Sequence, residues 1–220
     1  MKVRHFSAES EVERVRRAQA DYARLAGEYD SATRWIDAAR VAAVARLALR
    51  PGETVADLGC GTGFCLPLLA HAVAADGNVY GVESSADMLH RASERVAGLA
   101  NVVLMHAPAE RTRLPSAPDA LLFSFAHDVL QSRAALENVL AQARPGARVV
   151  AVGSKLFPWW LAPANLWFLA RERGYVTSYG GFARPSRLLA GYLDAFEVRP
   201  LFPGNKYLAS GRVRGARLAA

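Results

Sequence analysis

Val55-Ala-Asp-Leu-Gly-Cys-Gly-Thr-Gly63 is the stretch that decides the fold. Thr54–Leu58 is a short β-prone run, and three glycines at alternating positions follow it directly. Glycine permits positive φ and lets a ligand approach the backbone closely, while the N-terminus of a following helix favours an anion. We therefore expect a ligand-binding turn between a strand and a helix.

The spacing of the glycines excludes two common ligand classes. A nicotinamide dinucleotide site requires G-x-G-x-x-G, but Phe64 stands where the third glycine would be, counted from Gly59. A P-loop requires G-K-[ST], and no lysine occurs between residues 3 and 154. Asp57 in the strand would repel a pyrophosphate, so the ligand is expected to carry an ammonium group.

Short apolar runs alternate with helical segments on the carboxyl side of this turn. We predict strands over 54–58, 78–83, 102–105, 120–124 and 147–152, and helices over 64–74, 84–97 and 133–143. This alternation predicts a mostly parallel, doubly wound sheet with helices on both faces. Outside it we predict helices over 8–26, 31–49 and 186–193, and two closing strands over 196–202 and 207–213.

A second acidic residue follows the glycines at a fixed interval. Glu83 ends the predicted second strand, twenty residues past Gly63. A carboxylate at that place can accept hydrogen bonds from both hydroxyls of an adenosine ribose. Asp57, the glycines and Glu83 together indicate a nucleoside ligand, because an ordinary strand-to-helix turn does not need all of them.

With these residues in view, the chain resembles the class I S-adenosylmethionine-dependent methyltransferases, in the broad group of small ubiquinone-biosynthesis-like enzymes. The resemblance is specific over about residues 52–153. Besides VADLGCGTG and VYGVE, it is carried by SSADMLHRA (84–92), MHAPAE (105–110), SFAHDVL (124–130) and RPGARVV (144–150). It implies a Rossmann-like α/β fold with a seven-stranded, mostly parallel sheet, a C-terminal antiparallel hairpin, N-terminal helices and an α-helical lid insertion after the fifth strand.

The same resemblance implies the cofactor and its contacts. The cofactor would be S-adenosyl-L-methionine and the product S-adenosyl-L-homocysteine. Many relatives have Asp where Pro108 stands, so backbone atoms or Glu110 would have to contact the adenine amino group. The implied cofactor-binding residues are Tyr29, Asp57, Gly59, Cys60, Gly61, Gly63, Glu83, Ser84, Met88, Ala109, Glu110, Ser124 and Phe125.

His127 is the candidate general base, because it follows the fourth strand at the carboxyl edge where ligands bind. A structural histidine bonded to backbone is the alternative. Cys60 and Cys65 have no His or carboxylate at ligand spacing, so we expect no metal site and read both as small packed residues.

The resemblance also divides the chain. We expect a single methyltransferase domain over residues 1–220. Its parts would be an N-terminal helical cap (1–50), a cofactor-binding core (51–153), a lid and acceptor segment (154–193) and a closing hairpin (194–213).

Charge is distributed unevenly along the chain. The formal net charge is +7, with −3 over residues 51–150 and +7 over residues 151–220. A nucleic-acid module would carry a basic stripe on its recognition element, so this distribution argues against a nucleic-acid partner. The most apolar stretch, 156–170, is shorter than the roughly 20 residues of a spanning helix. We expect a soluble, cytoplasmic protein.

The acceptor is expected to bind among the aromatic residues after the fifth strand. Twelve of the twenty aromatics lie after residue 150, including the dense patch Phe157-Pro-Trp-Trp160. They are typical of a hydrophobic core or of a lid over an apolar acceptor. We predict methyl transfer to a hydrophobic small molecule, neutral or anionic, at O, N or C. A peripheral-membrane phospholipid N-methyltransferase and a non-catalytic adenosyl-ligand binding subunit are the alternatives, and a membrane surface is the less favoured partner.

Overall fold

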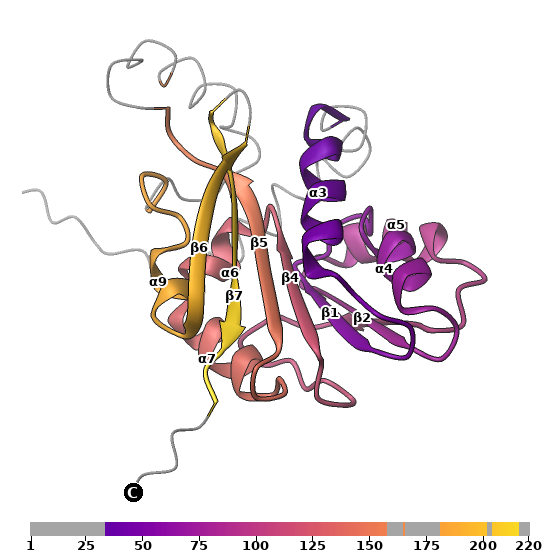
Figure 1. Ribbon diagram of the computed structural model, residues 1–220. Coiled ribbons are helices and arrows are strands. Elements are labelled where there is room, and N and C mark those ends of the chain that lie inside the picture. Colours follow the sequence, from indigo (N-terminus) through magenta and orange to yellow (C-terminus); the bar gives the residue numbers. More distant parts are fainter. Residues whose placement is uncertain (1–33, 158–164, 166–180, 202–203, 216–220) are drawn as a thin grey trace, which may run out of the picture.

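A computed structural model describes residues 34–157, 165, 181–201 and 204–215 of the chain. These residues form a sheet with helices on both of its faces (Figure 1). The predicted helix over 8–26 and most of the predicted lid lie outside the described residues. Among the described residues, no helix is long and apolar enough to cross a membrane.

The sheet has seven strands in the order β3-β2-β1-β4-β5-β7-β6. β1 to β5 are parallel, whereas β7 runs antiparallel to β5 and β6 antiparallel to β7. This is the predicted doubly wound sheet with a closing hairpin. The strands are β1 (Thr54–Leu58), β2 (Asn78–Glu83), β3 (Val102–His106), β4 (Ala120–Ser124), β5 (Arg148–Ser154), β6 (Leu193–Leu201) and β7 (Lys206–Val213).

The helices cover the sheet in two layers. The 3-10 turn η1 (Arg34–Ile36) leads into α3 (Asp37–Leu47), which lies on one face with α4 (Leu66–Val73) and α5 (Ala86–Arg95). The other face carries α6 (His127–Gln131), α7 (Arg133–Ala141) and α9 (Arg187–Ala190) (Figure 1). The connection between parallel strands always needs such a crossover.

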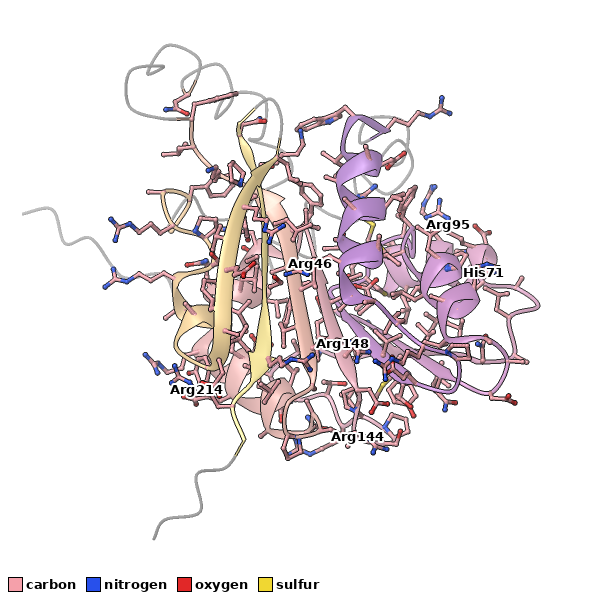
Figure 2. The ribbon with its side chains drawn as sticks, in the orientation of Figure 1. Arg46, His71, Arg95, Arg144, Arg148 and Arg214 are labelled. Carbon is pink, nitrogen blue, oxygen red and sulfur yellow. The ribbon has the colours of Figure 1, made fainter. Side chains whose placement is uncertain are left out.

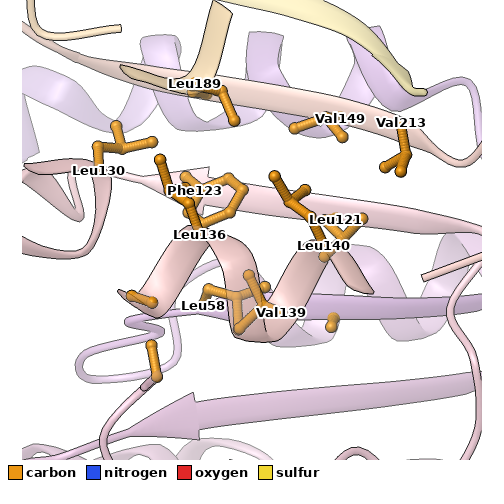
Figure 3. Packing of buried hydrophobic residues seen from close by; sticks show 14 of the residues in the cluster. Leu58, Leu121, Phe123, Leu130, Leu136, Val139, Leu140, Val149, Leu189 and Val213 are labelled. Atoms are coloured by element: carbon orange, nitrogen blue, oxygen red, sulfur yellow. The ribbon is translucent and has the colours of Figure 1, made fainter. Parts of the chain in front are cut away.

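Each face of the sheet buries its own hydrophobic core, because β1 and β4 are apolar at every buried position except Asp57 and Thr54. On the α7 face, Phe123 packs against Leu136 and Leu130 (Figure 3). On the α3 face, Leu47 and Leu69 belong to the second cluster. Burial of both faces explains why these strands read as continuous apolar runs.

One boundary error of three residues concerns the start of the hairpin. We predicted a helix over 186–193 and a strand from 196, but α9 ends at Ala190 and β6 begins at Leu193. The register of β6 against β7 shifts between Asp194 and Glu197, where Ala195 has φ +50°. A bulge of this kind breaks the two-residue alternation by which strands are recognised.

Candidate functional site

The candidate site lies at the carboxyl ends of β1, β2 and β4, where the strand order changes direction. β1 lies between β2 and β4, so the residues that follow these three strands meet at one edge. Successive strands extend from β1 to β3 in one direction and from β4 to β5 in the other. Open α/β sheets bind ligands at such a topological switch point.

The glycine turn after β1 is held by its neighbours rather than left open. The backbone N–H groups of Gly59 and Cys60 donate to Val82 O, at 2.8 and 3.0 Å. On the other side of the turn, the Arg95 guanidinium donates to Thr62 O at 2.6 Å (Figure 2 labels Arg95). Contacts from β2 and α5 therefore fix the path of the backbone before any ligand binds.

Glycine is required at two points of this turn. Gly59 has φ +74°, and a Cβ there would lie 3.0 Å from the Ala126 side chain after β4. Gly61 has φ +57°, and no atom lies within 4 Å of the place of a Cβ. A side chain at either position would be strained by the backbone. Only at Gly61 would it project into open space, so this part of the backbone is accessible to a ligand.

Asp57 at the end of β1 is the most unusual group in the fold. It is 1% exposed, and neither carboxylate oxygen has a hydrogen-bond partner among the described residues. Burial raises the pKa of Asp57 to about 7; the positive charge of Arg40 lowers this pKa and the negative charge of Glu83 raises it. Buried carboxylates are normally paired. Asp57 is thus an acceptor prepared for a cation or a hydrogen-bond donor.

Arg40 on α3 is a member of the site that we did not predict. It is 5% exposed and donates to Asp37 at 3.0 Å. Its guanidinium carbon lies 5.0 Å from the ring centroid of Phe64 and 5.8 Å from that of Phe125. Two aromatic rings from different elements thus hold a buried cation beside β1 and β4.

Glu83, the last residue of β2, accepts a hydrogen bond from the glycine turn. Its Oε2 accepts from Gly61 N at 2.9 Å, and its Oε1 accepts from the N–H groups of Ser84 and Ser85 at 2.8 Å each. A carboxylate has about four lone-pair sites. Three are used by backbone N–H groups, and the Ser84 hydroxyl also donates to Oε1 at 3.4 Å. Oε2, which among the described residues accepts only from Gly61 N, is therefore the oxygen with room for one further donor.

The start of α5 follows Glu83 directly. Ser85 is its N-cap, and its Oγ accepts from Met88 N at 3.4 Å. Met88 is 2% exposed, so most of its surface is in the core. Ser84 contributes its carbonyl, which lies 3.1 Å from His106 Nε2. Both residues lie at the start of α5, directly after β2, and their contacts with adenine stay a prediction.

The turn after β3 is tied to α7. Ala109 is buried, and its carbonyl accepts from Asn138 Nδ2 at 2.9 Å. Glu110 Oε1 accepts from the hydroxyl of Ser132, the N-cap of α7, at 2.7 Å. The Glu110 carboxylate thus has a structural partner, and its contact with adenine stays a prediction.

The residues at the end of β4 form the remaining part of the candidate site. Ser124 Oγ lies 3.7 Å from the thiol of Cys65, at the start of α4. Phe125 has φ +56° and donates its N–H to Val152 O at 2.8 Å. A positive φ in a residue with a large side chain is strained, and such strain clusters at functional sites.

His127 is the first residue of α6, three residues past β4. Its ring centroid lies 4.5 Å from that of Phe182, with the planes inclined at 52°. Phe182 is 3% exposed, so a buried aromatic residue packs against the candidate base. Tyr29 lies outside the described residues. The described part of the chain contains no group of three or more His, Cys, Asp or Glu that could hold a metal ion.

The residues at this edge fit S-adenosylmethionine. Its amino-acid end carries an ammonium and a carboxylate, and the site has the unpartnered Asp57 carboxylate and the buried Arg40 guanidinium. The open backbone at Gly61 and the Glu83 carboxylate lie on the β2 side, toward the start of α5. A buried carboxylate without a hydrogen-bond partner among the described residues, such as that of Asp57, is expensive unless a ligand of complementary charge binds it.

Comparisons with known proteins support this assignment. Residues 55–146 match the family described as "Methyltransferase domain". A 106-residue stretch is 33% identical to the arsenite methyltransferase of Halobacterium salinarum, covering 46% of this chain and 27% of that protein. An 82-residue stretch is 34% identical to the 2-phytyl-1,4-naphtoquinone methyltransferase of Trichormus variabilis, covering 35% of this chain and 36% of that protein. The match therefore spans about a third of the length of these relatives.

A solved structure extends the likeness beyond the matched segment. The complex described as DhpI–SAH superposes with a TM-score of 0.66 at 22% identity, covering 93% of this chain and 99% of that one. At this identity the likeness concerns the fold. The narrower ubiquinone-biosynthesis-like grouping stays a prediction. Residues 55–146 thus match a methyltransferase domain, and the sheet order and glycine turn support a class I S-adenosylmethionine-dependent methyltransferase fold.

Proposed function

We propose that the protein transfers a methyl group from S-adenosylmethionine to a hydrophobic small-molecule acceptor. The observation that carries this proposal is Asp57, whose two buried oxygens have no partner among the described residues beside an open glycine backbone. When bound, the cofactor supplies an electrophilic methyl group on a sulfonium. The protein's task in such a displacement is mainly alignment and electrostatic complementarity.

Different residues of the chain would bind different parts of the cofactor. Asp57 would accept hydrogen bonds from the ammonium, and Arg40 would hold the carboxylate of the amino-acid end. Glu83 would accept from a ribose hydroxyl with its remaining lone pair. Ser84, Met88 and the Ala109–Glu110 turn would flank the adenine.

The identity of the domain says less about the methyl acceptor than about the cofactor. The two relatives are named for arsenite and for a naphthoquinone, so this domain serves unlike acceptors. Ser124 and Phe125 would lie beside the reacting centre, at the end of β4. His127 would remove a proton from an oxygen acceptor, with Phe182 fixing its ring from the side. The apolar side chains of α3 would help to exclude water from the reacting centre.

The test is acceptor-dependent release of S-adenosylhomocysteine by the full chain. The acceptor panel should contain naphthols, reduced quinones, phenolic acids, aromatic amines and phosphatidylethanolamine vesicles. We expect turnover with at least one hydrophobic small molecule, loss of turnover in Asp57→Asn, and a lower kcat in His127→Ala with phenolic acceptors. Turnover with vesicles alone would contradict the small-molecule proposal. Cofactor binding without turnover on an extended panel would contradict catalysis.

A further inference from the structure

Two side-chain amides of α7 hold the loop over residues 107–114, which follows β3. Asn138 Nδ2 donates to Ala109 O at 2.9 Å and to Thr112 O at 3.0 Å. Gln142 Nε2 also donates to Thr112 O, at 3.2 Å, and its Oε1 accepts from Leu114 N at 2.9 Å. Asn138 and Gln142 are four residues apart, so they lie on one side of the helix. The backbone of the 107–114 loop is thus bound to α7 by four hydrogen bonds.

These hydrogen bonds are made where water has little access. Thr112, on which both amides converge, is 1% exposed, and Ala109 is also buried. The other polar atom of Asn138 is used as well, because its Oδ1 accepts from Arg113 Nη1 at 2.6 Å. Removing the Asn138 amide would leave a buried carbonyl of Ala109 without this donor, which is costly away from water.

The helix gives the 107–114 loop a firm base. Leu136 and Leu140 of α7 belong to the same buried cluster as Phe123 of β4 (Figure 3). At the start of the helix, the N-cap Ser132 donates its hydroxyl to Glu110 Oε1 at 2.7 Å. A loop that is fastened along a packed helix keeps its backbone atoms in fixed positions, as precise recognition of a ligand requires.

The 107–114 loop lies directly beside the residue proposed to bind the ribose. Its first N–H, that of Ala107, donates to Glu83 O at 3.1 Å. β2 and β3 are paired in parallel up to Glu83 and His106, so the loop leaves the sheet at the same edge as Glu83. A base attached to a ribose at Glu83 would therefore lie within reach of this loop.

The hydrogen bonds to α7 use carbonyls of the loop and leave two of its N–H groups available. Arg111 N and Thr112 N both donate to Pro108 O, at 3.0 Å each. Ala109 N and Glu110 N have no acceptor among the described residues. Adenine has an acceptor, ring nitrogen N1, next to its amino group. The Ala109–Glu110 turn can therefore donate to the edge by which adenine differs from other purines.

We propose that Asn138 and Gln142 are positioning residues for the adenine of S-adenosylmethionine and set the selectivity for this base. This inference rests on the proposed function, in which the Ala109–Glu110 turn flanks the adenine. The two amides act through the turn, because they hold its N–H groups where N1 can accept from them. Hypoxanthine carries a proton on N1, which would face these N–H groups. A turn fixed to α7 cannot move aside and rejects hypoxanthine, whereas a released turn can adjust to either base.

Two ligands that differ only at this edge of the base test the proposal. S-adenosylhomocysteine and S-inosylhomocysteine are each titrated by calorimetry into the full chain at pH 8. We expect the wild type to bind S-adenosylhomocysteine at least about tenfold more tightly, because hypoxanthine leaves one donor facing another. In Asn138→Ala the preference should fall to within about threefold, mainly because S-adenosylhomocysteine binds more weakly. Gln142→Ala should lower it by less, because Asn138 still holds both carbonyls.

Asn101→Ala is the matched control. Asn101 Nδ2 donates to Ala74 O at 2.8 Å and to Ala70 O at 3.4 Å, and Asn101 lies at the start of β3, at the opposite edge of the sheet. The same amide is removed from two carbonyls in both variants, so the melting temperature should fall in both. Only Asn138→Ala should change the preference between the two bases. A merely structural role for Asn138 would move the melting temperature alone.

The possible results separate this inference from the function on which it rests. Equal binding of the two ligands by the wild type would overturn the inference, whatever the variants do. It would also be overturned if folded Asn138→Ala, or Gln142→Ala where Asn138→Ala does not fold, kept the wild-type preference, or if Asn101→Ala lost it equally. Failure of the folded wild type to bind S-adenosylhomocysteine would count against the proposed function itself.

Discussion

Replacing Asp57 by asparagine should make the ligand-free protein less sensitive to pH. The Asp57 pKa is about 7 in the folded protein, against an ordinary value of 3.8. A carboxyl whose folded pKa is raised binds more protons in the folded than in the unfolded state between these two values. The free energy of unfolding therefore falls as pH rises from 3.8 to 7.

The size of the effect follows from the same shift. Between pH 5 and pH 7 the unfolded Asp57 is ionised while the folded one is still largely protonated. In this range the free energy of unfolding falls by about 1.36 kcal/mol per pH unit. Between pH 5 and pH 8, the titration of Asp57 should therefore lower the free energy of unfolding of the wild type by about 2.5 kcal/mol. The amide introduced by Asp57→Asn does not titrate, and the variant should be spared this loss.

Urea unfolding of ligand-free wild type and Asp57→Asn at pH 5 and pH 8 measures the difference. Every other group titrates in both proteins, so the difference isolates Asp57. Exposed Asp87→Asn is the matched control and should follow the wild type. The Asp57→Asn variant should also lose S-adenosylhomocysteine binding, and wild-type affinity should fall as pH drops below 7. Equal pH dependence in wild type and Asp57→Asn would refute the account of a buried, unpaired carboxylate.

Three further substitutions test the rest of the site. Glu83→Gln should weaken S-adenosylmethionine binding by about tenfold or more and lower the melting temperature, since an amide cannot accept all three backbone N–H groups. Calorimetry measures the affinity and a thermal scan the melting temperature. Unchanged affinity would contradict the proposed contact between Glu83 and the ribose. Gly61→Ala and Gly98→Ala should each cost about 1–2 kcal/mol in urea unfolding, because both have positive φ without crowding. Only Gly61→Ala should also lose cofactor affinity; equal affinity in the two variants contradicts a ligand at the turn. Arg40→Met should weaken cofactor binding by about tenfold. The loss should be larger below pH 8, because removing the Arg40 charge raises the Asp57 pKa further. The control variant Arg46→Met, at an exposed position, should bind the cofactor as the wild type does.

The fold was readable from sequence because its central strands are buried on both faces. β1, β2 and β4 begin and end at the predicted residues, since turns and polar residues bound each apolar run. α4 and α5 each begin two residues later than predicted, because the glycine turn and the Ser85 cap delay their first turns. The Asp57–Gly63 and Glu83 signals pointed to one edge of the sheet, and the structure brings these residues together there.

Arg40 was missed although its position carried a signal. It lies on the buried stripe of α3 with Ile36, Ala39 and Ala43, where a basic residue is out of place. Composition concealed it, because arginine is frequent throughout the chain. The burial of Lys206 could not be predicted from periodicity, since its contact with Trp35, which is distant in sequence, forms only in the tertiary fold.

The central claim is that the edge around Asp57 binds S-adenosylmethionine. Calorimetric titration of the full chain with S-adenosylmethionine at pH 8 tests this most directly. We predict one site per chain, with binding lost in Asp57→Asn although that variant remains folded. Absence of binding to the folded wild type, or undiminished binding to the variant, would contradict the claim.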